Sequence, residues 1–231
     1  MLVSFWSPKG GCGTSVFAAA CALVAARHGP TLLADLDGDQ PAILGIAADP
    51  GAGLFDWLAL GTEASPSALD RIALDAAPSL TLLPAGSRRP ASDAGSDAGC
   101  ALADALAARS TTCLIDLGRA DSPAAVAIGE RAALTIAAIR PCYLAFRRAT
   151  RHPLLVATKG AVMFDEPGRV LSAHDLRSVL GWRVLAQIHP RPAAATTVDA
   201  GLLASRIPEP LARAARRVLE SFGDNDGWRA A

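Results

Sequence analysis

The sequence predicts an α/β protein with a doubly wound, mostly parallel sheet that is flanked by helices in three layers. Short apolar runs alternate with helical patterns along the 231 residues, which are enough for one good-sized core. The runs are continuously apolar, as expected for strands that are covered on both faces. Repeated alternation of strand and helix favours parallel strands that are joined by right-handed crossovers.

The elements follow from these runs and from the glycines between them. The expected strands are residues 2–6, 31–36, 80–85, 112–117, 134–139, 154–159 and 183–188. The expected helices are residues 15–27, 40–47, 53–60, 94–108, 123–131, 142–150, 172–180, 196–204 and 208–222. Gly29 and Gly181 stand where helical patterns stop, a common place for glycine. We expect one domain over 1–222, an exposed loop over 86–99 and a flexible polar tail over 223–231.

Composition narrows the class of protein and its location. Apolar residues make up 51% and charged residues 19%, which excludes a disordered chain. The net charge is zero, so contact with DNA or anionic lipid would need a local patch. The start, MLVSFW, has no secretory pattern, and no apolar run is long enough to span a bilayer. The five cysteines, an odd number without a C-x-x-C pair, are typical of reduced core residues, so we expect a cytoplasmic protein.

The stretch SPKGGCGTS, residues 7–15, predicts a loop that binds phosphate. Its three glycines allow a tight turn that directs several backbone N–H groups to one point, and the helix that follows adds its positive dipole end. The cradle would consist of the N–H groups of Gly10, Gly11, Cys12, Gly13 and Thr14. The hydroxyl of Ser15 could bind a Mg²⁺ ion that bridges phosphates.

Two other interpretations of this loop stay open. It could be a glycine-rich turn that binds nothing. It could also be a dinucleotide fingerprint, but Val16 stands where that pattern requires its third glycine, so this interpretation is weak.

The loop resembles the deviant Walker A motif of the ParA/MinD family of P-loop ATPases, K-G-G-x-G-[K]-[ST]. The resemblance implies that Lys9 reaches across an ATP-sandwiched homodimer to the partner subunit's phosphates, and that it takes part in catalysis. The family's second lysine, which serves the nucleotide of its own subunit, is replaced here by Thr14. This is the sharpest departure from the family's pattern.

Two further segments resemble family motifs in the expected order. The stretch LLADLDGDQPAILGI, residues 32–46, is similar to the second-strand motif, which implies that Asp35 and Asp37 lie near Mg²⁺ and the attacking water. The stretch TCLIDLG, residues 112–118, is similar to Walker B, which implies that Asp116 holds Mg²⁺ through water. Asp116 alone could equally be a helix cap or a turn former. The resemblance covers nearly the whole chain and is closest to the TadZ/CpaE-like or actinobacterial ParA-like branch.

The resemblance implies a homodimer that binds ATP and Mg²⁺ and positions a cargo through a protein adaptor. The cargo could be pilus or secretion machinery, a plasmid or a chromosome. A charged hydrogen bond from the missing lysine is worth roughly 1.5–3 kcal/mol, or about 10- to 150-fold in affinity. We therefore expect weakened ATP binding and slow or absent hydrolysis, since the transition state depends most on that charge. The alternatives are a catalytically dead scaffold that works through partners, and a DNA-partition ATPase with a ParB-like partner.

The remaining predictions concern surfaces and the nucleobase. Arginines cluster at Arg147, Arg148 and Arg151, and again at Arg213, Arg216 and Arg217. They could bind DNA nonspecifically, but a solvated helix face is the commoner reason for such clusters. The residues after 222 lack a basic amphipathic stripe, so we expect no membrane anchor. The resemblance implies that adenine is contacted after the sixth strand, where this chain has Thr158 and Lys159, and residues 188–193 could line that side by analogy, but no adenine contact is assigned. Arg119 or Arg140 could compensate for Thr14.

Overall fold

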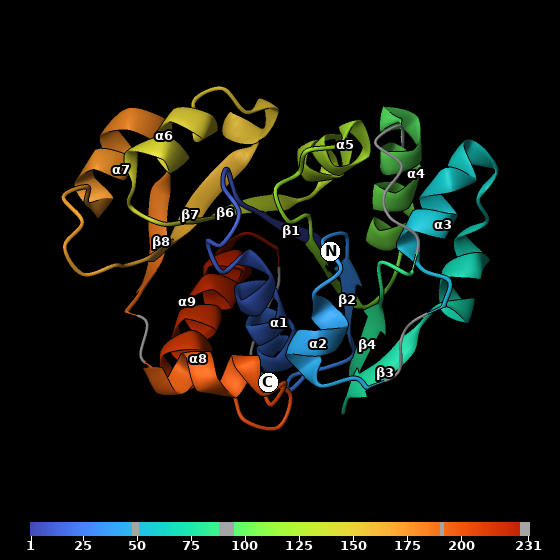
Figure 1. The fold of residues 1–231 in the computed structure, drawn as a ribbon. Coiled ribbons are helices and arrows are strands. Elements are labelled where there is room, and N and C mark those ends of the chain that lie inside the picture. Colours follow the sequence, from blue (N-terminus) through green and yellow to red (C-terminus); the bar gives the residue numbers. More distant parts are fainter. Residues whose placement is uncertain (48–50, 88–94, 190–191, 227–231) are drawn as a thin grey trace.

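The computed structural model describes residues 1–47, 51–87, 95–189 and 192–226 (Figure 1). Its centre is an eight-stranded sheet in the order β3-β4-β2-β5-β1-β6-β7-β8. Every neighbouring pair is parallel except the β3–β4 hairpin at one edge. The predicted fold class is therefore confirmed, with a central β1 that has a parallel neighbour on each side.

The elements have the following bounds. The strands are β1 Leu2–Trp6, β2 Thr31–Asp35, β3 Leu74–Ala77, β4 Leu80–Leu83, β5 Thr112–Asp116, β6 Leu134–Ile139, β7 Thr158–Phe164 and β8 Arg183–Ile188. The helices are α1 Thr14–Ala25, α2 Gln40–Leu44, α3 Leu54–Ala59, α4 Ser96–Ala107, α5 Pro123–Arg131, α6 Tyr143–Ala149, α7 Ala173–Leu180, α8 Pro192–Asp199 and α9 Glu209–Asp226. Short 3₁₀ helices cover η1 Gly61–Glu63, η2 Pro66–Arg71 and η3 Pro153–Leu155.

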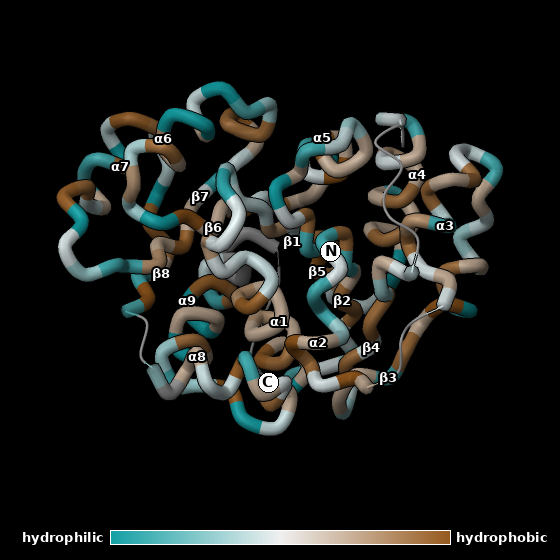
Figure 2. Tube along the Cα trace, in the orientation of Figure 1, coloured by the Kyte–Doolittle hydropathy of each residue, from teal (hydrophilic) through white to brown (hydrophobic). Residues whose placement is uncertain are grey.

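Two apolar cores cover the two faces of the sheet. Helices α1, α2, α8 and α9 lie on one side, and α3 to α7 lie on the other (Figure 1). Neighbouring residues of β1 enter opposite cores: Phe5 packs with Phe17 of α1, and Trp6 packs with Trp182 after α7. Figure 2 shows the hydrophobic residues concentrated along the strands and on the inner sides of the helices. This two-sided burial explains why the strands are apolar throughout rather than alternating.

Two strand predictions need correction. The expected strand at 154–159 is wrong, because Pro153 opens the 3₁₀ helix η3 and the strand β7 begins only at Thr158. Gly160, just beyond the expected strand, lies inside β7 with Leu185 packed over it. The edge strand β3 was not predicted; it is short and half exposed, and it turns into β4 through Ser79 at a φ of 60°.

Three boundaries also differ at the C-terminal end and in the central loop. The helix expected at 196–204 runs instead from Pro192 to Asp199, and α9 continues to Asp226, beyond the expected end of the domain at 222. Within the expected exposed loop 86–99, residues 88–94 lie outside the described residues, and α4 already begins at Ser96. No helix among the described residues is long and apolar enough to cross a membrane.

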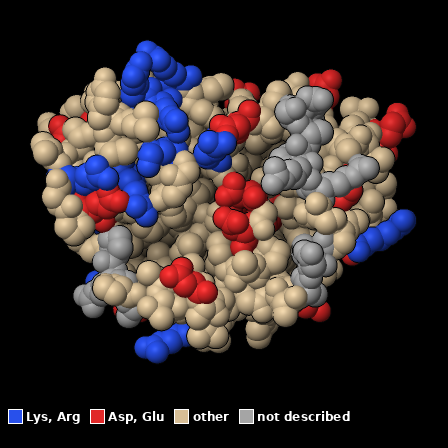
Figure 3. Space-filling view, in the orientation of Figure 1, with Lys and Arg blue, Asp and Glu red and all other residues tan. Residues whose placement is uncertain are grey.

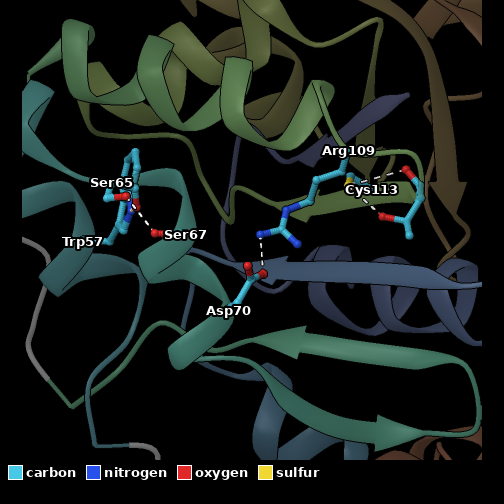
Figure 4. A network of polar contacts seen from close by, with 7 residues as sticks. Trp57, Ser65, Ser67, Asp70, Arg109 and Cys113 are labelled. Carbon is cyan, nitrogen blue, oxygen red and sulfur yellow. Dashed lines mark hydrogen bonds and ion pairs between the residues drawn. The ribbon is translucent and has the colours of Figure 1, made fainter.

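Polar contacts fix the connections at the edge of the sheet that lies on the β3 side (Figure 4). Arg109, just after α4, donates to the carboxylate of Asp70 in η2 at 2.6 Å. The indole N–H of Trp57 in α3 donates to the carbonyl of Ser65 at 2.9 Å. These two contacts join the segment around η2 to helices α3 and α4, and they stabilise this edge of the sheet.

The contact between α4 and α5 supports a stability prediction. A Cβ on Gly99 of α4 would overlap the carbonyl oxygen of Ala124 and come within 2.7 Å of its Cα. We expect Gly99→Ala to lower the free energy of unfolding by about 2 kcal/mol, since the helix backbones must separate. Chemical denaturation measures this. Gly29→Ala is the matched control, because no atom lies within 4 Å of its added Cβ. An unchanged midpoint in Gly99→Ala would contradict the close helix contact.

Candidate phosphate-binding site

The loop between β1 and α1 has the backbone shape that the glycine pattern predicts. Gly11 and Gly13 have φ values of 75° and 84°, in the left-handed region that favours glycine. Gly13 has a second reason to be glycine, because a Cβ there would lie 2.9 Å from the ring of Phe164 at the end of β7. The loop is held at its start by Ser7, whose N–H donates to Gly118 O at 2.8 Å and whose hydroxyl donates to Lys9 O at 3.1 Å.

Helix α1 begins directly after the loop with no side chain capping it. Gly13 is the residue before the first turn, and no acidic residue lies in that turn. The first N–H groups of a helix have no partner within the helix, and they carry the positive end of its dipole. Together with the loop, they form a site that is suited to an anion such as phosphate.

Thr14 cannot take the place of a lysine here. Its side chain is short, uncharged and buried in the first turn of α1. The positive groups around the loop come from other segments: Lys9 within it, Arg119 after β5 and Arg140 after β6. The Arg119 side chain lies along Gly10, with its Cδ 3.7 Å from the position of an added Cβ, and its head group pairs with Asp121 at 2.5 Å.

Arg140 lies on the other side of the loop, behind Cys12. Its guanidinium donates to Glu166 at 2.6 Å, and it lies close enough to Cys12 to influence the thiol. The Arg140 Nε is buried and has no partner among the described residues. Burial raises the pKa of the Cys12 thiol, so this cysteine is a packed, protonated group.

Two buried carboxylates meet at the ends of neighbouring strands. Asp35 ends β2 and Asp116 ends β5, directly opposite each other in the parallel register, and both are fully buried. Asp35 accepts N–H groups from Asp37, Gly38 and Gln40. Burial is the main cause that raises the pKa of Asp35 to about 6 and the pKa of Asp116 to about 7, and the Asp35 charge raises the latter further.

Gln40, the first residue of α2, ties these acids to the loop. It is completely buried, and its amide N–H₂ donates to Asp116 Oδ2 and to the carbonyl of Ser15, each at 2.9 Å. Among the described residues, its Oε1 is buried without a partner. Gln40 was not predicted as a site residue, because its place directly after the run DLDGD is not a distinctive pattern for a buried amide.

Ser15 and Asp37 complete the cluster on the solvent side. The Ser15 hydroxyl donates to Asp37 Oδ2 at 3.3 Å. The Asp37 carboxylate is exposed and lies so close to Gly118 that a Cβ there would overlap it. The structure therefore brings Ser15, Asp37 and Asp116 together beside the first turn of α1, with Gly10 to Thr14 forming the wall next to them.

The oxygen atoms of this cluster fit a Mg²⁺ ion that is shared with phosphate. A hydroxyl, an exposed carboxylate and a buried carboxylate with a raised pKa would all gain from a cation, and Gln40 Oε1 lacks a partner. The described residues contain no group of three or more His, Cys, Asp or Glu placed to hold a metal. Mg²⁺ keeps several waters and takes few protein ligands beside phosphate oxygens, so one hydroxyl and two carboxylates are a suitable set.

Two residues considered for adenine, Thr158 and Lys159, lie away from the loop. Thr158 is buried, accepts from the Trp6 indole at 2.9 Å and donates to Leu154 O at 2.6 Å. Lys159 follows it at the start of β7, whereas the loop lies at the opposite, carboxyl end of the sheet. Asp165, which pairs with His189 at 3.1 Å, and Glu166 follow that carboxyl end. Residues 190–191 of the third suggestion, 188–193, lie outside the described residues.

A glycine-rich loop after a central parallel strand, an uncapped helix and acids at the ends of two strands define the class of P-loop α/β proteins. The chain has the P-loop NTPase fold of ParA/MinD-family ATPases, an eight-stranded, mostly parallel sheet with flanking helices. No protein-family model matches the sequence, and no curated protein matches it.

Solved structures with this fold are similar over nearly the whole chain at low sequence identity. A ParA family ATPase from Chlorobium tepidum has a TM-score of 0.74 and 19% identity, covering 93% of this chain and 95% of its own. The septum site-determining protein MinD of Pyrococcus horikoshii has a TM-score of 0.77 and 19% identity, covering 96% and 95%. A putative plasmid partition protein from Borrelia burgdorferi has a TM-score of 0.76 and 14% identity, covering 96% and 98%.

The buried acids predict a pH dependence of stability in the absence of ligand. Asp116 has a pKa of about 7 in the folded protein, raised from 3.8, so its contribution to stability is complete below pH 4 and is lost as the pH rises through 7. The loss for this group is on the order of 4 kcal/mol. Denaturation midpoints between pH 4 and 8 measure it. Asp116→Asn should flatten this slope, and an unchanged slope would contradict the assignment. Asp104→Asn, on the exposed side of α4, is the control.

Proposed function

We propose that this protein is a nucleotide-dependent switch that binds ATP with Mg²⁺, dimerises and positions a cellular cargo. The observation that carries the proposal is the meeting of Ser15, Asp37 and Asp116 beside an uncapped helix and a glycine-rich loop. A phosphate anion and a divalent cation are the ligands whose charges suit these two halves of the site.

Each residue has a distinct part in this proposal. The N–H groups of Gly10, Gly11, Cys12, Gly13 and Thr14 hold the phosphates, and Lys9 reaches the phosphates of the partner subunit. Ser15 and Asp116 would hold Mg²⁺, and Asp37 would orient the attacking water. When bound, Mg²⁺ supplies the positive charge that neutralises neighbouring phosphate oxygens.

The absence of a lysine at position 14 lowers the rate of ATP hydrolysis that we expect. Within one subunit, no cationic side chain extends from the first turn of α1 toward the phosphates, because Thr14 and Ser15 occupy it. Developing charge on the transferred phosphoryl group is therefore stabilised less, and hydrolysis is slow or absent. Arg119 and Arg140 are both candidates to compensate: Arg119 lies along Gly10 and pairs with Asp121, and Arg140 pairs with Glu166.

Proteins with the same fold support the nucleotide and the type of role. The Pyrococcus horikoshii MinD structure is a complex with Mg-ADP, and a Cyanothece McdA variant was solved with ATP. One Aquifex aeolicus structure is a complex of MinC with MinD. For this chain we propose a cytoplasmic homodimer that engages a protein adaptor. The TadZ/CpaE-like resemblance favours pilus or secretion machinery as the cargo over a plasmid or chromosome.

A role in DNA partition receives less support from the arginines of α9. Arg213 and Arg216 both approach the carboxylate of Glu209, at 3.8 and 3.0 Å, which reduces the net charge of that cluster. A DNA-partition ATPase would need these groups free for phosphates. ATP-dependent retention on DNA that falls with salt, and that is lost when these arginines are replaced, would favour this second function.

Titration calorimetry with ATP and Mg²⁺ tests the proposal. We expect measurable binding by the natural protein, with affinity raised about 10- to 150-fold in Thr14→Lys because a charged hydrogen bond is restored. Ser15→Ala should weaken binding only when Mg²⁺ is present. Lys9→Ala should weaken binding and abolish ATP-dependent dimerisation, measured by light scattering.

The same titration separates the proposal from a catalytically dead scaffold. No heat with the natural protein, together with binding restored in Thr14→Lys, would contradict nucleotide-dependent switching and support the scaffold. Lys159→Ala is a control for Lys9→Ala, because Lys159 lies at the opposite end of the sheet.

A further inference from the structure

A second positively charged site lies beside the phosphate loop. A hollow of about 490 Å³ opens between the loop, the segment after β5 and helix α6. Its lining includes Pro8, Arg119, Asp121 and three arginines in or just after α6: Arg147, Arg148 and Arg151. The loop itself is therefore one wall of this hollow.

The hollow concentrates positive charge in a chain whose net charge is zero. Its four arginines face a single carboxylate, Asp121, which Arg119 already contacts at 2.5 Å. Among the described residues, no ion pair joins Arg147, Arg148 or Arg151 to a carboxylate, whereas Arg109, Arg131 and Arg140 all have one. Figure 3 shows the basic atoms gathered at the top of this face.

The elements that carry these arginines are firmly packed. Ala145, Phe146 and Ala149 bury one side of α6, so Arg147 and Arg148 stay on the exposed side. His152 is half buried and stacks on Trp6 with ring centres 4.2 Å apart. Burial lowers the pKa of His152, so the imidazole adds no charge near neutral pH. The arginine heads thus extend from a fixed frame, which reduces the entropy lost when a ligand orders them.

We propose that this hollow binds a small phosphorylated molecule, a di- or triphosphate of nucleotide size, separately from the phosphate loop. Arginine forks match phosphate oxygens in pairs, and three uncompensated charges suit a concentrated polyanion better than a single carboxylate. The volume is within the range of small-ligand pockets, about 300–1,000 Å³. Duplex DNA would instead need a basic surface that follows its backbone over many phosphates, whereas these arginines line a concave hollow.

The occupant of the hollow would influence the phosphate loop through shared atoms. Arg119 lines the hollow and also lies against Gly10, and Pro8 belongs to both. A phosphate that competes with Asp121 for Arg119 changes where that guanidinium points. The hollow is thus a regulatory site as well as a binding site.

Calorimetric titration of the full chain with inorganic tripolyphosphate, without Mg²⁺, tests the proposal. The variant R147S/R148S/R151S removes three charges from the hollow, and R27S/R71S/R206S removes three exposed arginines from other elements. We expect affinity to fall at least about tenfold in the first variant, since several charged hydrogen bonds are lost. It should change less than about threefold in the second, where only the overall charge differs.

A variant of the phosphate loop separates the two sites. Gly11→Asp places a carboxylate in the loop, at a position with open space and a positive φ that Asp tolerates better than most residues. It should abolish ATP binding with Mg²⁺ and leave tripolyphosphate binding in the hollow intact. If the protein does not bind ATP at the loop, tripolyphosphate binding in the hollow would still be detected, so the two proposals can fail separately.

Several results would overturn the proposal. Equal tripolyphosphate affinity in the two arginine variants would show that the arginines of the hollow do not bind it. Complete loss of binding in Gly11→Asp would show that the phosphate loop is the binding site. Arginine-dependent binding of duplex DNA or of a polyglutamate peptide without binding of tripolyphosphate would assign the hollow to a macromolecule. If the triple variant does not show a cooperative thermal transition, Arg148→Ala and Arg151→Ala replace it, each with an expected loss of about threefold to tenfold.

Discussion

The cluster of Asp35, Gln40, Asp116 and Ser15 is the arrangement on which the rest of the site depends. It joins the ends of β2 and β5 to the first turn of α1 through a single buried amide, that of Gln40. Burial is the main cause that raises the pKa values of both carboxylates, and the charge of Asp35 adds to the shift of Asp116, so ionising both groups destabilises the fold. A cation at this point would remove the repulsion, so the fold itself creates an affinity for positive charge next to an anion site.

The loop shows how much of phosphate binding is a property of the backbone. The left-handed glycines, the uncapped helix and the contact between Gly13 and Phe164 are all present although the usual lysine is not. A backbone cradle provides affinity for a bound phosphate, whereas a mobile charged side chain mainly stabilises the transition state. A loop that keeps the cradle without the lysine is therefore consistent with the proposed switch, in which nucleotide is held longer than it is turned over.

The sequence predicted the central sheet well because strands covered on both faces carry an unmistakable apolar pattern, as in β1, β2 and β5. It failed at β3, where half-exposed residues in a short edge strand give a weak signal, and at β7, where the apolar run 154–157 belongs to a 3₁₀ helix and its end rather than to the strand. The loop and the acids were predicted from motifs along the chain. Gln40 was not, because its importance comes from two partners, Ser15 and Asp116, that only folding brings near. The hollow beside Pro8 was missed for the same reason.

Charge is separated around the loop in a way that composition alone hides. The carboxylates gather on the β2 and β5 side, while the uncompensated arginines gather on α6, across the loop from them. At short range a protein of zero net charge can therefore offer a cation site and an anion site within one small region. Arg119 lies between the two, paired with Asp121 and resting on Gly10. The guanidinium of Arg119 cannot bind an anion in the hollow and stay equally close to the phosphate loop. A ligand in the hollow therefore changes the positive charge near the loop. This would link the two sites without a large movement of the fold.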